Sequence, residues 1–395
     1  MSVITIVGAG MMGTAIGFPA VENGHEIRLV GTPLDDQIID HARATHEHLT
    51  LKRRIPQGFR FYQFSECDEA MAGADLIVSG VSSFGVDWFS EIMIPRIPED
   101  MPVLGVTKGM VDLENGEMIS YPEYYMLKHP GRKLRLCAVG GPCTSYELAD
   151  RDPTEVCFCG EEPDLLRWIK GLFETDVYHI SLSTDVRGVE CAVAMKNAYA
   201  LGVSLAIGLS EKREGVIGRE HYNSQAALFG QSVREMRRLI ALNGSSDENI
   251  VYGAGDLYVT VFGGRTRKIG TLLGRGLSFE AAMNELSGVT LESIVIATRT
   301  ARAVRALIGR GVCSAAEFPL LMHIDDIINH SAPVNIPWRM FETEFGAGAK
   351  AYIQALRTTA GAPTPIGAPA VVYAMARAIF IMAVKVFCRS AALRP

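Results

Sequence analysis

The stretch of sequence that decides the fold is Val3-Ile-Thr-Ile-Val7-Gly8-Ala-Gly10-Met-Met-Gly13. Its first five residues predict a short buried strand that runs straight into the glycines. A helical pattern follows and ends near Asn23-Gly24, and the residues from Glu26 to Val30 predict a second strand. A strand, a glycine turn, a helix and a second strand within roughly 30 residues are typical of a dinucleotide-binding βαβ unit.

Each glycine of this turn has a physical task in such a unit. Gly8 allows the tight turn, Gly10 lets the backbone approach a pyrophosphate, and Gly13 lets the helix pack closely on the strand. The N-terminus of the helix then faces the anion. We therefore predict that a dinucleotide cofactor, NAD or NADP, is bound by Gly8, Gly10, Met11, Met12 and Gly13.

The end of the second strand bears on the choice between NAD and NADP. NAD sites usually carry an Asp or Glu there, which bonds the ribose 2′-hydroxyl. In this chain the place is taken by Gly31-Thr32-Pro33, and Asp35 and Asp36 come only later. Without a carboxylate to repel it, a 2′-phosphate can be accommodated, with Thr32 or Arg28 as its contact. Both cofactors stay open, and NADP is at least as well favoured as NAD.

Apolar runs typical of strands alternate with helical patterns over the first half of the chain. The strand candidates are Asp75–Ser79, Pro102–Val106, Leu134–Val139, Glu155–Cys159 and Val177–Ser181. This alternation predicts parallel βαβ units in a doubly wound sheet. Later patterns predict helices over Arg187–Ile207, Asn223–Asn243, Ser278–Leu286 and Leu291–Ile308. We expect a Rossmann α/β domain over residues 1–182, an all-helical domain over 183–335, and an extra C-terminal tail, helical in part, over 336–395.

Composition favours a cytoplasmic enzyme. The chain has 395 residues, enough for two domains, and its formal net charge of −6 gives no electrostatic reason to bind nucleic acid. Its eight cysteines show no CxxC spacing and no secretory leader precedes the first strand, so we expect reduced thiols. Cys157 and Cys159 are predicted to be packing residues on one face of a strand. His46 and His48 have no matching ligand set for a metal, so we predict no metal site and place them on a polar loop or helix face.

A Lys-Asn pair lies in the most apolar of the predicted helices, in the stretch Gly188-Val-Glu-Cys-Ala-Val-Ala-Met-Lys196-Asn197-Ala-Tyr-Ala-Leu-Gly. A buried ammonium group must be paired or its pKa must fall, because desolvation disfavours the charge. One interpretation is a lysine whose stem packs on the core while its head reaches water. The other is an amine that transfers a proton beside a bound cofactor, and the dinucleotide fingerprint favours it.

A series of motifs resembles the NAD(P)-dependent glycerol-3-phosphate dehydrogenase family over roughly residues 1 to 335. In chain order they are Gly8-Ala-Gly10-Met-Met-Gly13, Val81-Ser-Ser-Phe-Gly-Val86, Thr107-Lys108-Gly109, Gly140-Gly-Pro142 with Glu147, Lys196-Asn197, Asn223-Ser-Gln-Ala-Ala-Leu228, Gly253-Ala-Gly-Asp256-Leu-Tyr-Val-Thr260 and Gly263-Gly-Arg265-Thr-Arg-Lys-Ile-Gly270. Both their order and their spacing fit, and the segment Gly31-Thr32-Pro-Leu-Asp35 looks most like archaeal members. The family interconverts dihydroxyacetone phosphate and sn-glycerol 3-phosphate by hydride transfer.

The resemblance implies a role for each site residue. Lys196 is the general acid in reduction and the base in oxidation, Lys108 steadies the reacting oxygen, and Asp256 orients Lys196. Substrate contacts are implied for Lys108, Asn197, Thr260, Arg265 and Thr266, with the Arg265 guanidinium on the phosphate. Cofactor contacts besides the glycine turn are implied for Thr32, Ser83, Phe84, Arg265 and Glu292. From the residues alone, Asp256 also suits a helix N-cap, and the segment from Arg265 to Lys268 suits a solvated basic loop.

Two departures from the family pattern bear on the substrate. Thr266 stands where the family normally has asparagine, and Leu291-Glu292-Ser293 lacks the usual glycine. A hydroxyl offers one donor where an amide offers two. The alternatives are therefore a dehydrogenase of another small phosphorylated hydroxyketone or hydroxy acid, such as the 6-phosphogluconate or hydroxyisobutyrate dehydrogenases, and a non-catalytic dinucleotide-binding protein.

The segment from residue 336 to 395 lies outside the resemblance. Its apolar part, from Ile366 to Cys388, contains Arg377 and Lys385. It is long enough to span a bilayer, but two buried cations would be costly there. We expect it to pack on the protein or on a partner subunit, with membrane association as the less favoured alternative. We also expect the enzyme to be a homodimer.

Overall fold

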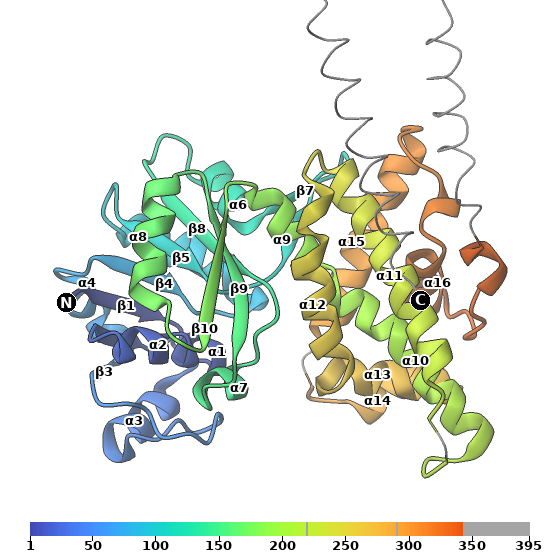
Figure 1. Ribbon diagram of the computed structural model, residues 1–395, viewed down its shortest axis with the longest axis horizontal. Coiled ribbons are helices and arrows are strands. Elements are labelled where there is room, and N and C mark those ends of the chain that lie inside the picture. Colours follow the sequence, from blue (N-terminus) through green and yellow to red (C-terminus); the bar gives the residue numbers. More distant parts are fainter. Residues whose placement is uncertain (219, 290, 343–395) are drawn as a thin grey trace, which may run out of the picture. The chain divides into compact units, whose positions relative to one another are not determined.

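An eight-stranded sheet forms the core of the N-terminal half of the protein, and β1 (Val3–Val7) lies inside it (Figure 1). This computed structural model describes residues 1–218, 220–289 and 291–342. The strands lie in the order β10-β9-β8-β5-β4-β1-β2-β3. The bounds of the other seven are β2 Glu26–Val30, β3 Phe59–Tyr62, β4 Leu76–Ser79, β5 Pro102–Gly105, β8 Arg135–Gly140, β9 Thr154–Gly160 and β10 Tyr178–Ser183.

The sheet is mostly parallel, with one reversal that the sequence interpretation misses. Strands β3, β2, β1, β4, β5 and β8 pair in parallel, but β9 is antiparallel to β8 and parallel to β10. The connection from β8 to β9 holds only the short helix α7 (Ser145–Ala149). A parallel crossover needs a long connection, usually a helix that packs along the sheet, so the chain turns back instead.

Helices cover both faces of the sheet. One face packs against α1 (Met11–Ala15), α2 (Gly17–Glu22), α3 (Asp36–Thr45) and α8 (Pro163–Phe173). The other packs against α4 (Cys67–Met71), α5 (Val86–Trp88) and α6 (Tyr121–Lys128). Central strands are therefore buried on both sides, and every residue of β4 is buried, as expected for parallel strands. The predicted packing of Cys157 and Cys159 is confirmed, since both are fully buried.

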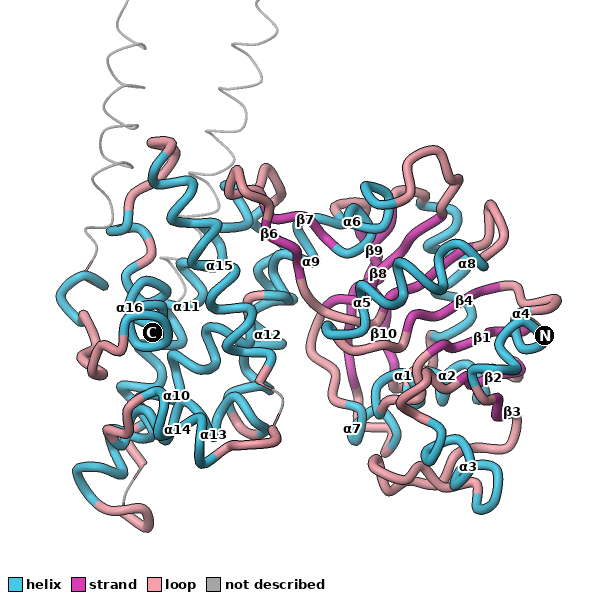
Figure 2. The backbone as a smooth tube through the Cα atoms, turned by 180° about the vertical axis from the view of Figure 1, so that it is seen from behind, coloured by secondary structure: helices cyan, strands magenta, loops and turns pink. Residues whose placement is uncertain are grey.

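The helices of the second half pack around α10 (Lys196–Glu214), which is buried along most of its length. The others are α9 Val186–Ala194, α11 Tyr222–Leu242, α12 Ile250–Val261, α13 Gly264–Arg275, α14 Phe279–Glu285, α15 Glu292–Gly309 and α16 Pro319–His330. Helices α10 and α13 lie very close together, since a Cβ on Gly274 would fall 2.2 Å from the Leu205 carbonyl oxygen. Figure 2 shows these helices beside the strand-containing half. The predicted Rossmann domain followed by a helical domain is confirmed.

The predicted helix over Arg187–Ile207 is two helices in the structure. They meet at Met195, which separates α9 from α10. Within the described residues, the combined stretch Val186–Glu214 is the one helical segment long and apolar enough to cross a membrane, and 83% of its most apolar part is buried inside the protein. Burial of this kind identifies a core helix.

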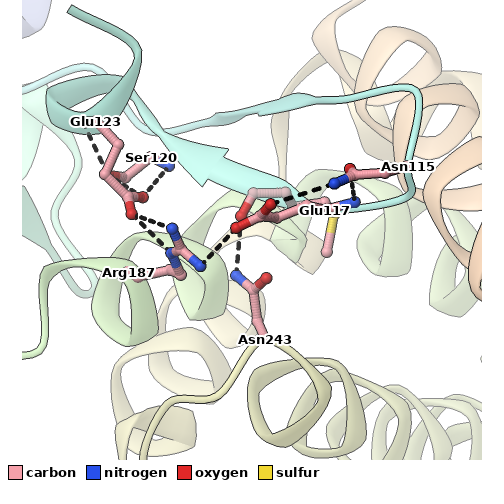
Figure 3. A network of polar contacts seen from close by, with 7 residues as sticks. Asn115, Glu117, Ser120, Glu123, Arg187 and Asn243 are labelled. Carbon is pink, nitrogen blue, oxygen red and sulfur yellow. Dashed lines mark hydrogen bonds and ion pairs between the residues drawn. The ribbon is translucent and has the colours of Figure 1, made fainter. Parts of the chain in front are cut away.

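A short hairpin, β6 (Met110–Asp112) and β7 (Met118–Ser120), extends from the sheet onto the helical domain. Arg187, on α9, donates to Glu123 at 2.7 Å and to Glu117 at 2.9 Å, and Asn243 donates to the Met118 carbonyl at 3.0 Å (Figure 3). The hairpin directly follows the Thr107-Lys108-Gly109 motif. These contacts therefore connect the hairpin, and with it the C-terminal end of the Thr107-Lys108-Gly109 motif, to the helical domain.

The predictions for the C-terminal tail fall almost entirely outside the described residues. Residues 336–342 are described, and Trp338–Phe341 form a short 3₁₀ turn. The predicted helix from Ile366 to Cys388 lies beyond them, together with the alternative of membrane association.

Candidate active site

The glycine turn is built around close backbone contacts that exclude side chains. Gly8 has a φ of 112°, and a Cβ on Gly13 would fall 2.3 Å from the Gly8 carbonyl oxygen. A Cβ on Gly10 would meet only the Gly80 carbonyl oxygen at 3.9 Å, so this glycine faces open space. The turn therefore has the shape of a cradle into which a pyrophosphate fits. Beside it, Met11 is partly exposed and Met12 packs on the sheet core.

A carboxylate does lie close to the end of β2 and to the glycine turn, contrary to the sequence interpretation. Asp35 Oδ2 accepts hydrogen bonds from the Thr32 N–H and hydroxyl, both at 2.8 Å, and from the Ala9 N–H at 3.2 Å. Arg28, one of the two expected phosphate contacts, is committed elsewhere, to Glu26 and to the Ala72 carbonyl. A turn at residues 32–35 brings the carboxylate back to the glycine turn, and spacing along the chain does not reveal it.

His48 also reaches the glycine turn, so its predicted place on a polar surface is wrong. The side chain is fully buried. Its Nε2 lies 2.9 Å from the Ala9 carbonyl oxygen, and its Nδ1 accepts from the Leu51 N–H at 3.0 Å. Because Nδ1 accepts, Nε2 carries the proton and donates. His48 therefore stabilises the glycine turn through the backbone of Ala9. Burial lowers the pKa of its imidazole.

Lys196, Lys108 and Asp256 form one ion-pair cluster, although they are far apart in the sequence. Lys196 Nζ donates to Asp256 Oδ1 at 2.6 Å, and Lys108 Nζ donates to Asp256 Oδ2 at 2.7 Å. Lys108 also donates to the Gly141 carbonyl. The carboxylate is 1% exposed and the two lysine side chains 16% and 13%. A buried carboxylate that accepts from two ammonium groups has its charge compensated.

Packing between α9 and α12 explains how this cluster forms. A Cβ on Gly253 would fall 2.6 Å from the Ala192 carbonyl oxygen, so this glycine lets the two helices touch. Asp256 follows one turn later and faces Lys196 at the start of α10. The aspartate lies in the middle of α12, so the alternative interpretation of Asp256 as a helix N-cap is wrong.

The surroundings of Lys196 change its acidity. Burial lowers the pKa of Lys196 below its usual value, while the Asp256 carboxylate raises it and the Lys108 charge lowers it again. Burial is the largest of these influences. A lowered pKa makes the neutral amine accessible at a lower pH, which suits a group that both donates and accepts a proton.

A cavity of about 510 Å³ opens beside this cluster. Seven residues predicted from the sequence line it, namely Lys196, Asn197, Asp256, Thr260, Arg265, Thr266 and Glu292. Arg265 and Thr266 belong to the first turn of α13, so the segment that the alternative describes as a solvated loop begins a helix. Arg265 is exposed and, within the described part of the chain, its guanidinium forms no ion pair, whereas Arg267 pairs with Glu220. A free guanidinium at a helix N-terminus suits a phosphate.

Other predicted contacts lie at the edge of this cavity or away from it. Ser83 donates to Glu292 Oε1 at 2.9 Å, which joins the two halves of the site, and Phe84 next to it is 55% exposed. The Thr260 hydroxyl donates to the backbone carbonyl of Asp256, not to its carboxylate. The predicted residues that do not line this cavity are those of the glycine turn, Met11, Met12, Thr32, Ser83, Phe84 and Lys108, which reaches the cluster through Asp256.

Four lining residues escape the sequence interpretation: Cys143, Thr144, Ser145 and Tyr146. They precede Glu147, which does belong to a recognised motif and lines the cavity too. Thr144 caps α7 by accepting from the Glu147 N–H. The pattern of a threonine three residues before a glutamate was the available signal for this turn.

Comparisons with known proteins match both halves of the chain. The description "NAD-dependent glycerol-3-phosphate dehydrogenase" matches twice, its N-terminus over residues 3–165 and its C-terminus over residues 185–338. The NADP(+)-dependent glycerol-3-phosphate dehydrogenase of Archaeoglobus fulgidus is 32% identical over 286 residues, which are 72% of this chain and 83% of that protein. The NAD(P)+ enzyme of Koribacter versatilis is 28% identical over 334 residues, 83% of this chain and 93% of its own length.

Solved structures resemble the fold. Glycerol-3-phosphate dehydrogenase from Coxiella burnetii matches with a TM-score of 0.69 at 21% identity, over 86% of this chain and 97% of that one. The Plasmodium falciparum enzyme matches with a TM-score of 0.72 at 18% identity, over 86% and 95%. At these identities the structures support the fold alone. Together with the sequence matches to both halves, they lead to one conclusion: the chain belongs to the NAD-dependent glycerol-3-phosphate dehydrogenase family.

Proposed function

We propose that the protein interconverts dihydroxyacetone phosphate and sn-glycerol 3-phosphate with NAD or NADP. The observation that carries this proposal is the paired Lys196–Asp256–Lys108 cluster, of which Lys196 and Asp256 line a cavity that Arg265 also lines. The cluster supplies a proton donor and the arginine supplies a phosphate ligand. These two groups match the two ends of a three-carbon phosphorylated ketone.

The proton is handled by Lys196. Reduction of the carbonyl adds a hydride to carbon and a proton to oxygen, and the ammonium group of Lys196 donates that proton. In oxidation the neutral amine takes the hydroxyl proton back. Lys108 keeps a positive charge next to the reacting oxygen, which stabilises the developing alkoxide. Asp256 holds both lysines in place through its two carboxylate oxygens.

The phosphate is assigned to the first turn of α13. Arg265 offers a planar fork that binds two oxygens at once. Thr266 adds one hydroxyl donor, and the N–H groups of the helix start add further donors. Asn197 and Thr260, on the same cavity wall, are left for the hydroxyl groups of the substrate. The substitution of the family asparagine by Thr266 changes one contact and leaves the charge of the site intact.

The cofactor is assigned to the glycine turn and to the loop that carries Ser83. A bound nicotinamide supplies a hydride in one direction and accepts it in the other. Gly8, Gly10 and Gly13 shape the cradle for the pyrophosphate, as the tight backbone contacts require. Ser83 and Glu292, which bond each other, are polar groups able to bind a carboxamide.

Oxidation of NADH and of NADPH in the presence of dihydroxyacetone phosphate tests this proposal. Turnover is expected, and Lys196→Ala should lower kcat by about 10²–10⁴-fold, the usual contribution of a general acid. Lys128→Met, which removes an exposed lysine, is the control and should leave kcat unchanged. Tight cofactor binding without any turnover would instead favour the non-catalytic alternative.

The cellular setting and the assembly are part of the proposal. The seven cysteines of the described residues are all unpaired, which favours the reducing cytoplasm. Val251 and Tyr258 on α12, and Phe262 at its C-cap, follow one face of the helix and are each more than half exposed. Such an apolar face suits a homodimer contact. Light scattering of the purified protein measures the dimer directly, and Tyr258→Glu should shift it toward the monomer.

A further inference from the structure

A small buried cavity lies behind the loop that carries Lys108. Strands β4, β5 and β8 contribute its floor at their carboxyl ends, and helices α6 and α9 cover it. The polar side chains on its wall are Ser79, Thr107, Tyr121, Tyr125 and Glu190. The space available to the centre of a water molecule is about 10 Å³, which corresponds to one water.

Several polar atoms on this wall have no protein partner. Glu190 and Tyr121 are 0% and 3% exposed. Within the described residues, the two carboxyl oxygens of Glu190 and the Tyr121 hydroxyl have no hydrogen-bond partner. Ser79 Oγ likewise makes no hydrogen bond of normal geometry. Buried polar atoms of this kind are nearly always bonded to protein or to ordered water, because leaving them unpaired is costly. The two Glu190 oxygens and the Tyr121 hydroxyl therefore point to a shared ligand, while the Ser79 hydroxyl beside them also interacts with Tyr125.

The chemistry of these groups suits a water molecule. Burial raises the pKa of Glu190 well above its usual range, which favours the protonated carboxyl group, a form with both a donor and acceptors. The Tyr121 and Ser79 hydroxyls can each donate or accept. One water needs two to four such partners, and a neutral site with mixed donors and acceptors offers no preference for an ion.

The same groups support the Thr107-Lys108-Gly109 loop. The Tyr121 hydroxyl packs against Gly109, where a Cβ would fall 2.2 Å from the hydroxyl oxygen. Thr107 lines the cavity and donates to the Val81 carbonyl. The Lys108 charge lowers the pKa of Glu190, against the larger effect of burial, which raises it. The hairpin contacts of Figure 3 hold the loop from its other end.

We propose that this cavity binds one ordered water molecule, held by Glu190, Tyr121 and Ser79, and that the water anchors the loop and so positions Lys108. Glu190 is then a positioning residue that touches neither substrate nor cofactor. The binding of the water is independent of the reaction. The effect on Lys108 rests on the proposed function.

Diffraction and thermal unfolding test the water site. A high-resolution crystal structure of the full chain should show one water within hydrogen-bond distance of Glu190 and Tyr121. Tyr121→Phe removes a partner of that water and should lower Tm by about 2–4 °C. A dry cavity, or a Tm that is unchanged or raised by Tyr121→Phe, would overturn the proposal, because removal of a truly unpaired hydroxyl is neutral or stabilising.

Kinetics with dihydroxyacetone phosphate test the positioning of Lys108. Glu190→Leu should lower kcat about 10–100-fold through a displaced loop, and Glu190→Gln, which keeps a donor and an acceptor, should restore most of it. In a Lys108→Ala background, Glu190→Leu should have no further effect on kcat. An equal loss in both backgrounds would show that Glu190 acts without Lys108 and would overturn this role.

The two proposals fail in different ways. A wild-type protein without turnover would overturn the proposed function. The diffraction and unfolding experiments would still decide whether the water is bound.

Discussion

Besides burial, which lowers the pKa of Lys196 most, two charged groups have opposite effects on it. The Asp256 carboxylate raises that pKa and the Lys108 ammonium lowers it. In reduction the protonated lysine is the active form, so the rate falls as pH rises through the pKa. We expect Asp256→Asn to move this fall to lower pH and Lys108→Met to move it to higher pH, as measured by the pH dependence of kcat for reduction.

The maximal kcat is expected to drop in both variants. The pH at which kcat falls on the alkaline side of the profile, its alkaline limb, is therefore the quantity to compare. Lys128→Met, which removes an exposed charge outside the cluster, is the control and should leave the limb in place. Shifts in the same direction for both variants would contradict the assignment of the limb to Lys196.

Among the described residues Arg265 forms no ion pair, and it lines the cavity, so it should determine substrate affinity. Loss of a hydrogen-bonded charge contact costs about 1.5–3 kcal/mol, or roughly 10–150-fold. We expect Arg265→Ala to raise KM for the phosphorylated substrate by this factor. Arg267→Ala is the matched control, because Arg267 is paired with Glu220 and does not line the cavity. A rise confined to the KM of the cofactor would reassign Arg265 to cofactor binding.

Asp35 should influence the choice between NAD and NADP. Its carboxylate is held at the glycine turn by the Ala9 and Thr32 N–H groups. A 2′-phosphate placed there would be repelled. We expect Asp35→Asn to raise the ratio of kcat/KM with NADPH to that with NADH about tenfold or more. The exposed neighbour variant Asp36→Asn is the control. An unchanged ratio would limit Asp35 to a structural part in the turn.

At the scale of elements, a side chain of α11 caps the start of α16. Glu235 is fully buried and accepts from the Leu320 N–H at 2.8 Å and the Leu321 N–H at 2.9 Å. Gln231 and Tyr199 donate to the same carboxyl. These groups occupy N–H donors that a helix start leaves unpaired. The N-cap residue Phe318 makes no side-chain hydrogen bond to the helix start, so α16 depends for its cap on a residue more than eighty positions earlier.

Glu235 should make stability depend on pH. Burial raises its pKa to about 7, so between roughly pH 4.5 and 7 the folded state holds a proton that the unfolded state has lost. The contribution of the protonated Glu235 to the free energy of unfolding is fully present below pH 4.5. It is lost as pH rises through 7, and the loss amounts to at most about 3 kcal/mol. Denaturant unfolding at several pH values measures this slope.

The variant Glu235→Gln does not titrate and should flatten the slope in that window. It should also lower stability by about 1–3 kcal/mol, since the amide NH₂ faces N–H donors. Glu248→Gln, at an exposed position, should keep the slope of the wild type. The same slope in Glu235→Gln as in the wild type would assign the pH dependence to other groups.

At the scale of the whole molecule, every predicted site residue lies before residue 343. Residues 1–341 form one compact unit, and the family matches end at residue 338. We therefore expect a chain that ends at residue 342 to bind the cofactor and to keep kcat and KM within about twofold of the full chain. The truncation removes none of the residues predicted to contact substrate or cofactor. Steady-state kinetics of the two proteins decide this, and a loss of activity would assign a functional part to the C-terminal segment.

The sequence predicted the central strands well and the connections less well. The runs at β4, β5 and β8 are apolar throughout because both faces are buried, so they are visible without a structure. The direction of β9 is not visible, since strand direction follows from the path of the connection. The break at Met195 is hidden too, because an apolar helix and two apolar helices in line have the same periodicity.

The sequence by itself determined the dinucleotide-binding fold and supplied the candidate reactive groups. Glycine spacing and apolar runs are local properties, and Lys196, Asp256 and Arg265 stand in recognisable motifs. Only the tertiary structure decided which groups meet. The pairing of both lysines with Asp256, the return of Asp35 and His48 to the glycine turn, and the unpaired Glu190 behind Lys108 join residues that are distant in the chain. Their interaction depends on helix packing and burial, which no local pattern encodes.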